Sequence, residues 1–463
     1  MFDLSKEFEE FYKDYVVLHS KEQNDLRKKK NINVKNLKEG LKEYNKENNT
    51  DYKIAEIRVQ GSMAMHTVVQ NDNKDYDIDV AIVFEKENLK SKSEEYLGAL
   101  AARNIVKNAL KKKCTKFNVE PETLTNCVRI TYAKGYHIDF AVYRRFKVEG
   151  NNEYLYEHAG SSWGSRNPAA INEWFSAEVE TKGQELRKII RLSKMFCKSR
   201  DSWVNMPGGL LQSVLCDEKI QNSYTRLDEV FYYTMKNIKE RLENDIEVYN
   251  PTDTTLTLLT TDKHKTKMNN WCSKLGSELD KLNILFDDNC TKEVAQDAWY
   301  NFFQHSYWKN KEVVSEAFSV SKGGYTYTDT EEFIEDEVDI SEQYYVEIVC
   351  KVSAHGFDTQ PINKFFEDHP QFKRLVPRGF SISFEVVSTN VPVPYKVWWK
   401  VRNVGEEAEK RDEIRGQIEK KFGEKKKETA KFFGPHYVEC YIIKGGKCVA
   451  IDYIDVPISS TAL

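Results

Sequence analysis

A strand-like run that opens with two acids constrains this chain more than any other feature of its sequence. Residues 77–84 read Asp-Ile-Asp-Val-Ala-Ile-Val-Phe. The β-branched residues predict a buried strand, and side chains two positions apart on a strand point to the same face. We therefore expect the carboxylates of Asp77 and Asp79 to converge. Because like charges repel unless a cation lies between them, the pair indicates either an exposed strand end or a Mg²⁺ site.

A glycine and a serine, Gly61 and Ser62, precede this acidic pair in the sequence. Ser62 lies 15 positions before Asp77. Residues 56–60 predict a strand that delivers Gly61 and Ser62 to the start of a short helix, where backbone N–H groups and the hydroxyl can hold a phosphate. A Gly-Ser pair is also an ordinary turn and helix cap. Combined with two carboxylates at this spacing, it favours a phosphate-binding turn. Asp75 forms a rival acidic pair with Asp77, but it precedes the apolar run and is expected in a loop.

A third acid is embedded in a second apolar strand. Two-metal phosphoryl transfer needs a further ligand to orient the attacking hydroxyl. Residues 135–143 are the only other strongly apolar, strand-like segment at a plausible distance that contains an aspartate. Since an isolated carboxylate in such a strand is costly without a partner, we predict Asp139 as the third ligand rather than a partly exposed strand residue. His137 shares its face, and we expect it to serve strand packing rather than to support the site.

These residues together resemble a known family. Gly61-Ser62, Asp77, Asp79 and Asp139 resemble the polymerase-β-type nucleotidyltransferases, and specifically the bacterial cGAS/DncV-like enzymes (CD-NTases of the SMODS type). The resemblance implies an α+β fold, in which a polymerase-β-like nucleotidyltransferase core combines a small mixed sheet with a helical lobe. It implies catalytic and metal-binding roles for the three acids, and nucleotide binding by Gly61 and Ser62. The implied cofactor is Mg²⁺, or Mn²⁺ in its place.

A basic helix follows in the same order as in that family. Residues 184–200 resemble the family's central helix, and Lys194 matches the lysine that binds the triphosphate. Read without the family, an apolar stripe lies beside a basic face that is either a phosphate-binding surface or an ordinary solvated face. That basic face comprises Arg187, Arg191, Lys194 and Lys198.

One position departs from the family pattern. Where the family often has a phosphate-contacting serine, this chain has Gly208 and Gly209, which offer only backbone N–H groups. Ser213 is near in sequence, but nothing in the pattern argues that it substitutes.

The chain divides into regions of different character. We expect a catalytic core with its helical lobe in residues 1–310, an acidic linker in 311–345 and a mainly β C-terminal domain in 346–463. The periodicity of residues 4–30 predicts a helix that packs across the catalytic sheet. The segment 170–310 should be mostly helical, leaving a nucleotide-binding cleft beside the sheet.

The C-terminal region carries its own resemblance. Residues 391–403 and 436–441 resemble the AGS-C sensor domain, which implies that an unknown activating ligand or protein acts there. Strand alternation places at least one of Trp398 and Trp399 in the core. His436 and Arg402 fit either a sensor pocket or structural hydrogen bonding.

Composition limits where the protein acts. The formal net charge of −4 gives no global attraction to nucleic acid. The nine cysteines include no Cys-x-x-Cys pair, which favours reduced thiols. No stretch approaches the roughly 18 apolar residues of a membrane span. We therefore expect a cytoplasmic protein without direct membrane contact.

The family resemblance implies a reaction. It implies that ribonucleoside triphosphates are joined into a cyclic di- or oligonucleotide second messenger of bacterial anti-phage signalling, which acts on a downstream effector. Two alternatives stay open. One is a nucleotidyltransferase that modifies an RNA or protein acceptor, and the other is a non-catalytic nucleotide sensor.

Overall fold

The computed structural model falls into two compact units. Unit 1 comprises Met1–Glu22, Lys35–Glu56 and Gln60–Lys322, and unit 2 comprises Gln23–Val34, Ile57–Val59 and Gly323–Leu463. Most of the expected linker, 311–345, lies outside the described residues, as does Asp75. The structure describes the chain except for residues 71–75, 114–119, 133–134, 149, 151–152, 310–331, 333, 339, 341, 343, 404–405, 412, 421–422, 432 and 463.

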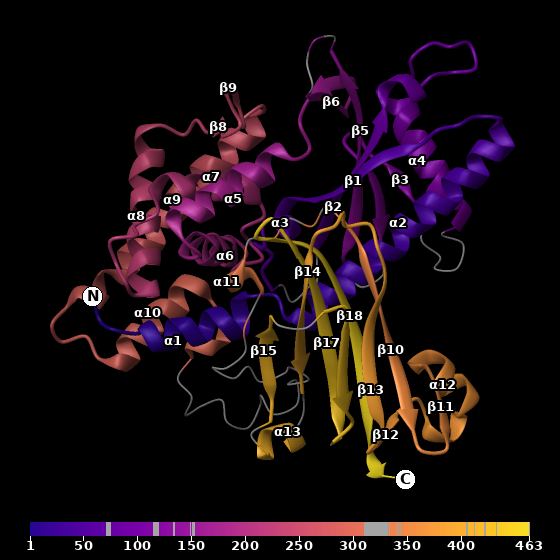
Figure 1. Ribbon diagram of the computed structural model, residues 1–463. Helices are drawn as coiled ribbons and strands as arrows, with labels where there is room; N and C mark the ends of the chain where they lie inside the picture. Colours follow the sequence, from indigo (N-terminus) through magenta and orange to yellow (C-terminus); the bar gives the residue numbers. More distant parts are fainter. Residues whose placement is uncertain are drawn as a thin grey trace. The chain divides into compact units, whose positions relative to one another are not determined.

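A seven-stranded mixed sheet carries the acids of unit 1 (Figure 1). Its path runs β1–β2–β5–β4–β3, with β6 paired to β5 and β7 to β6. Strand β2 is parallel to β5, whereas β4 is antiparallel to it, so the expected mixed sheet is confirmed. The strands are β1 (Ile54–Gln60), β2 (Asp77–Glu85), β3 (Glu122–Thr123), β4 (Val128–Thr131), β5 (His137–Lys147), β6 (Tyr154–Ala159) and β7 (Trp163–Ser165).

Two helices pack closely in the same unit. The second half of α2 (Ser20–Asn48) lies against α4 (Ala99–Lys113), and a Cβ built on Gly40 would overlap the carbonyl oxygen of Ala109. Only glycine allows this approach of two helix backbones. Lys112 and Lys113 of α4 form ion pairs with acids of α2. These contacts fix α4 next to the sheet, where it also contacts β5 and β6.

A helical lobe forms the rest of unit 1. Its core is dominated by aromatic rings, including Phe8, Phe231, Trp299 and Trp308, all fully buried. The expectation that the N-terminal helix packs across the sheet is wrong, because the rings of α1 face α8 and α10 instead. The elements are α1 (Ser5–Phe11), α5 (Ala170–Lys182), α6 (Glu185–Cys197), α7 (Gly209–Lys219), α8 (Leu227–Asn244), α9 (Asp262–Lys281), α10 (Lys292–Phe303) and the hairpin β8 (Tyr249–Asn250) and β9 (Asp253–Thr257).

Unit 2 is mainly β. A four-stranded sheet, β11–β10–β13–β16, and a five-stranded sheet, β12–β18–β17–β14–β15, share one hydrophobic core. The mainly β character expected of the C-terminal region is confirmed. The elements are β10 (Val346–Ala354), β11 (Phe357–Pro361), β12 (Val376–Arg378), β13 (Ser381–Thr389), β14 (Lys396–Arg402), β15 (Arg415–Glu419), β16 (Lys425–Thr429), β17 (Gly434–Lys444), β18 (Lys447–Ala462), α11 (Ile334–Glu337), α12 (Ile362–Asp368) and α13 (Glu406–Lys410).

The core of unit 2 contains one of the two neighbouring tryptophans, as expected. Trp399 is fully buried, and its ring nitrogen donates to the carbonyl of Gly423 at 2.9 Å. Trp398 lies on the opposite face of β14 and is half-buried. Arg402 is buried and donates to the backbone carbonyl of Asn403 at 3.0 Å, a structural role. His436 borders a cavity of about 190 Å³ within this unit.

Candidate active site

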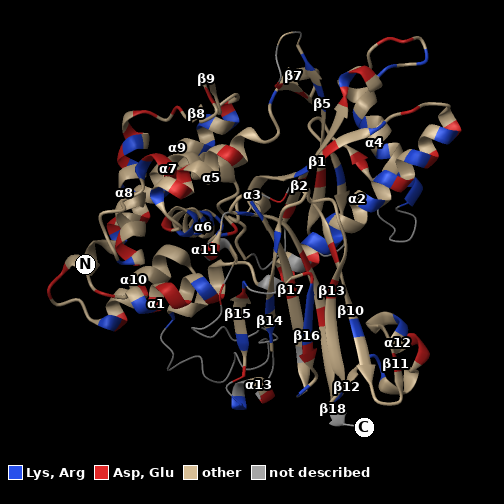
Figure 2. Cartoon of the chain, in the orientation of Figure 1, with Lys and Arg blue, Asp and Glu red and all other residues tan. Residues whose placement is uncertain are grey.

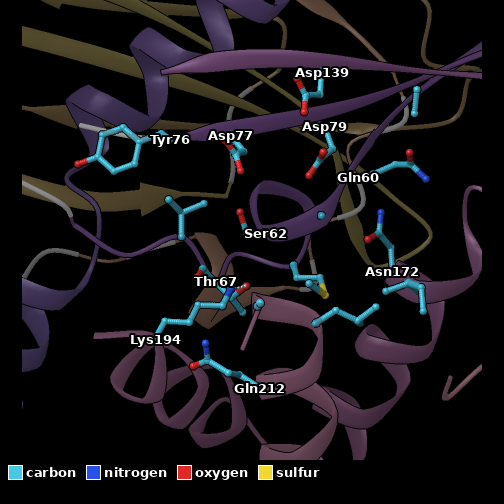
Figure 3. Close-up of a pocket in the computed structure, with 18 of the residues that line it drawn as sticks. Gln60, Ser62, Thr67, Tyr76, Asp77, Asp79, Asp139, Asn172, Lys194 and Gln212 are labelled. Atoms are coloured by element: carbon cyan, nitrogen blue, oxygen red, sulfur yellow. Dashed lines mark hydrogen bonds between the residues drawn. The ribbon is translucent and has the colours of Figure 1, made fainter. Parts of the chain in front are cut away.

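A cavity of about 610 Å³ opens in unit 1 between the sheet and the helical lobe. This volume lies in the usual range for small-molecule sites, roughly 300–1,000 Å³. Figure 3 shows acids of the sheet on one side and residues of helices α6 and α7 on the other. Every residue singled out from the sequence for catalysis, metal binding or nucleotide binding lines it: Gly61, Ser62, Asp77, Asp79, Asp139 and Lys194.

Strand register brings the three acids together. On the parallel pair β2 and β5, Asp79 lies directly opposite Asp139, and Asp77 lies opposite His137. Because residues two apart share a face, all four side chains lie on the same side of the sheet. Like charges directly opposite each other on neighbouring strands are destabilising. The arrangement therefore stores repulsion that a bound cation would relieve.

Asp77 is paired with a histidine. Its carboxylate contacts His137 Nε2, and the interpretation of His137 as plain strand packing is wrong. Burial would raise the pKa of Asp77, but the hydrogen bond and charge of His137, together with Arg129, outweigh it and lower that pKa. The same hydrogen bond raises the pKa of His137.

Asp79 occupies the centre of the acidic face. Burial, followed by the charges of Asp77 and Asp139, raises its pKa to about 6. Its carboxylate also lies against the turn at Gly61, because a Cβ built on that residue would overlap Asp79 Oδ2. Gly61 has a φ of +66°, a left-handed conformation that favours glycine. The turn and the acid therefore fit together only if residue 61 has no side chain.

Asp139 is held by an arginine that the sequence analysis missed. Arg129 of β4 faces Asp139 across an antiparallel pair and donates from Nε to Oδ1 at 2.7 Å and from Nη2 to Oδ2 at 2.6 Å. The signal was available: Arg129 stands between the apolar Val128 and Ile130, in a short strand just before the hairpin to Asp139. The sequence could not show which strand pairs with β5.

The donor chemistry of this face fits a divalent metal ion. Carboxylate oxygens are the ligands that Mg²⁺ prefers. Burial, and after it the charges of Asp77 and Asp139, raise the pKa of Asp79. Within the described part of the chain, however, no three acids, histidines or cysteines are gathered closely enough to enclose one ion. Instead, Asp77 forms an ion pair with His137, and Asp139 forms one with Arg129. Loading an ion therefore requires these carboxylates to turn.

The glycine and serine lie where the sequence predicts. Gly61 and Ser62 open α3 (Gly61–Ala64), directly after β1. Figure 3 places Ser62 between the acids and Lys194, facing the cavity. The serine carbonyl accepts from Thr67 N at 2.9 Å, which fixes the loop that follows.

Lys194 reaches the cavity from α6, whose basic residues are blue in Figure 2. Its ammonium group donates to the carbonyl and hydroxyl oxygens of Thr67 at 2.9 and 2.8 Å. Burial, followed by Lys198 and Arg191, lowers its pKa to about 7. An anion placed beside it would favour its charged form.

Three of the four residues of the basic face are buried, and only Lys198, directly after the last residue of α6, is exposed, so the interpretation as an ordinary solvated face does not hold for Arg187, Arg191 and Lys194. Arg187 and Arg191 are buried, and they donate to the carbonyl of Met65 and the hydroxyl of Tyr12. Lys194 and Lys198 line the cavity, whereas the two arginines do not. The helix therefore presents two cations to the cavity rather than four.

At Gly209 the departure has a steric explanation, whereas a Cβ on Gly208 would meet no atom within 4 Å. Both residues line the cavity, and a Cβ on Gly209 would lie 3.0 Å from Lys194 Cε and 3.2 Å from its Nζ. Glycine thus leaves room for the lysine. Ser213 donates to the carbonyl of Gly209 at 2.9 Å and does not line the cavity, so it does not replace the missing serine.

Among the helices described, none is long and apolar enough to span a bilayer.

Comparison with known proteins agrees with both units. Residues 55–143 match the family model of the cyclic GMP-AMP synthase DncV-like nucleotidyltransferase domain. Residues 328–459 match the adenylyl/guanylyl and SMODS C-terminal sensor domain. The first match contains Gly61, Ser62 and the three acids, and the second contains most of unit 2.

Relatives and solved structures extend this similarity. A cyclic GMP-AMP synthase of Escherichia albertii is 22% identical over 414 residues, covering 86% of this chain and 83% of the relative. The apo form of Vibrio cholerae DncV superposes with a TM-score of 0.53 at 18% identity, covering 66% of this chain and 96% of that one. A mutant of the same cyclase in complex with ATP and GTP superposes with a TM-score of 0.52 at 16% sequence identity. The match covers 64% of this chain and 94% of the mutant cyclase. At these identities the structures establish the fold.

Proposed function

We propose that this chain, a bacterial cGAS/DncV-like nucleotidyltransferase with a C-terminal AGS-C domain, joins ribonucleoside triphosphates into a cyclic di- or oligonucleotide. The observation that carries the proposal is the cross-strand pair of Asp79 and Asp139, with Asp77 beside it, facing a cavity that Lys194 also lines. A relative named cyclic GMP-AMP synthase and a cyclase solved with ATP and GTP support the substrate class.

Each residue has a defined part in the proposed reaction. Gly61, Ser62 and Lys194 bind the triphosphate of the donor nucleotide. Asp139 orients a ribose hydroxyl of the acceptor and takes up its proton. The hydroxyl oxygen bonds to the α-phosphorus, the bond from that phosphorus to the bridging oxygen breaks, and pyrophosphate leaves. For a dinucleotide a second such step closes the ring, and a larger ring needs one step for each nucleotide.

Asp77, Asp79 and Asp139 would hold the divalent cations. When bound, Mg²⁺ or Mn²⁺ neutralises the charge that develops on the phosphoryl oxygens. The carboxylates that would hold the cations lie across the cavity from Lys194 (Figure 3). A triphosphate between them would meet the lysine on one side and, once the cations are bound, their positive charge on the other.

The remaining features form one functional scheme. Residues 1–310 act as the catalytic core with its helical lobe, 311–345 as the linker and 346–463 as a sensor domain. An activating ligand or protein binds the sensor domain, and the cyclic product acts on a downstream effector in anti-phage defence. We place the protein in the cytoplasm, without direct membrane contact.

The test is incubation of the purified chain with the four labelled ribonucleoside triphosphates and Mg²⁺ or Mn²⁺. We expect a phosphatase-resistant product of low molecular weight, which mass spectrometry identifies by base, linkage and ring size. Label found only in added RNA or protein would favour the macromolecular acceptor. Nucleotide binding without turnover under every condition would favour the non-catalytic sensor.

A further inference from the structure

We infer that Arg129 is a built-in counter-cation of the acidic face, which occupies Asp139 and competes with the divalent ion for it. The inference rests on the proposed function only for the identity of the ion. Arg129 binds both oxygens of Asp139 at 2.7 and 2.6 Å, a fork geometry that is stronger than a single hydrogen bond.

The position of Arg129 gives it this role. Arg129, Asp139 and Asp79 lie opposite one another on β4, β5 and β2, so one row across the sheet reads cation, anion, anion. Arg129 neutralises the outer anion, whereas Asp79 lies opposite a carboxylate. Burial, and after it the charges of Asp77 and Asp139, raise the pKa of Asp79. The counter-cation therefore permits two opposed carboxylates to fold side by side without a metal ion.

The same contact opposes metal loading. A bidentate arginine takes the two oxygens of Asp139 that a metal would share, and its charge repels a dication. In agreement, the described residues contain no cluster of three ligands ready for one ion. We conclude that a divalent ion binds Asp139 only as Arg129 gives way.

Two physical roles for Arg129 predict opposite signs. If Arg129 served only to aim Asp139 at the metal, removing it would weaken cation binding, as loss of such supporting groups typically does by about 10–100-fold. If Arg129 competes, removing it strengthens cation binding, because a repelling charge is lost. The direction of the change decides between them.

The experiment measures Mn²⁺ binding to the full chain without nucleotide, by electron paramagnetic resonance of free Mn²⁺. We expect R129Q to bind Mn²⁺ about tenfold more tightly than the wild type at equal ionic strength. R129K, which keeps the charge but loses the fork, should lie between them. Mn²⁺ should also raise the unfolding temperature of R129Q more than that of the wild type.

Arg145 supplies a matched control. It lies on β5, on the same face, and donates to Glu85 at 2.8 Å and Glu56 at 3.1 Å. R145Q therefore breaks comparable ion pairs without touching the three acids, and its Mn²⁺ affinity should equal that of the wild type. Unchanged or weaker binding by both R129Q and R129K overturns the inference. No product is measured, so failure of the wild type to join nucleotides refutes the proposed function alone.

Discussion

A charged residue in the sheet of unit 1 lies opposite a residue of like charge, whereas one in the five-stranded sheet of unit 2 lies opposite a residue of opposite charge. In unit 2, Lys400 of β14 lies opposite Glu439 of β17, both almost fully buried and 3.3 Å apart. Tyr441 donates to the same glutamate at 2.9 Å. In unit 1, Asp79 lies opposite a second carboxylate. Opposite charges facing each other hold a sheet together, whereas like charges facing each other weaken it.

This difference separates structural charge from functional charge. The Lys400 and Glu439 pair is satisfied within the core and borders neither cavity described above. In the Asp79 and Asp139 pair, Arg129 balances the charge of Asp139, whereas Asp79 lies opposite another carboxylate, and both acids face a cavity large enough for nucleotides. Natural proteins retain destabilising groups mainly where activity requires them. The like-charged pair is therefore where we place the chemistry.

The largest expected effect comes from neutralising the centre of the acidic face. D79N should lower product formation by about a thousandfold or more, because it removes a charge that stabilises the transition state through the metal. The same change should raise the unfolding temperature, since it also removes the repulsion between Asp79 and its neighbours. Mass spectrometry of the product and thermal unfolding check the two effects on one sample.

The pH dependence sharpens this test. The folded-state pKa of Asp79, about 6, lies above its unfolded value, so the folded protein binds the proton more tightly. Its contribution to stability therefore falls as pH rises from about 4 to 6. The stabilisation by D79N should be larger at pH 7.5 than at pH 4.5. A variant that loses activity and stability together would break the comparison.

The second effect concerns unit 2. K400M removes the cation that lies 3.3 Å from the buried Glu439, and breaking such a pair costs about 3–5 kcal/mol. Hydrogen exchange of peptides from β14 and β17, read by mass spectrometry, should report that loss. The double variant K400M/E439L should recover most of it, because well-packed apolar residues can replace a buried pair. Equal exchange in K400M and the wild type would contradict a structural role for the pair.

The third effect tests the close fit between the turn and Asp79. G61A forces a side chain against Asp79 Oδ2 at a φ of +66°, so we expect product formation to fall by about a hundredfold. The control is G164A on β7, where a Cβ meets no atom within 4 Å. Steady-state kinetics of both variants should show a loss in G61A alone; a comparable loss in G164A would point to general damage to the sheet.

The smallest effect concerns Lys194. Because its pKa is about 7, Lys194 loses its charge in the free protein as pH rises above 7. A bound triphosphate would raise the pKa of Lys194 and so keep the ammonium group protonated. Affinity for a non-hydrolysable ATP analogue should therefore weaken about tenfold between pH 7.5 and 9. Isothermal titration calorimetry measures this slope. K194M should bind more weakly at pH 7.5 and lose the slope, and an identical slope in K194M would exclude this lysine as its source.

The sequence predicted the elements of the site better than their pairing. Alternation in residues 77–84 and 135–143 located two strands and the face on which their acids lie. It could not show that β2 and β5 are parallel neighbours in a register that sets Asp79 against Asp139, because register depends on long-range packing. The roles of the six predicted residues in catalysis and binding remain predictions.

The sequence analysis missed or misinterpreted residues whose partners lie on a neighbouring strand or helix. Arg129 pairs with Asp139 and His137 with Asp77, in each case on a neighbouring strand of the sheet. Thr67 accepts a hydrogen bond from Lys194 of α6. Gly209 was noted only as an absent serine, although it provides space for Lys194. The local pattern places Arg129 on a short strand, but the pairing of strands and helices that brings these side chains together is set by tertiary structure.

The most direct test of the central claim is a crystal structure of the chain with Mn²⁺ and a non-hydrolysable ATP analogue. Anomalous diffraction data would locate the manganese ions in that structure. We predict manganese peaks bound by the carboxylates of Asp77 and Asp79, with Arg129 turned away from Asp139 and the triphosphate between Ser62 and Lys194. Manganese or triphosphate bound elsewhere, with these acids left free, would contradict the account.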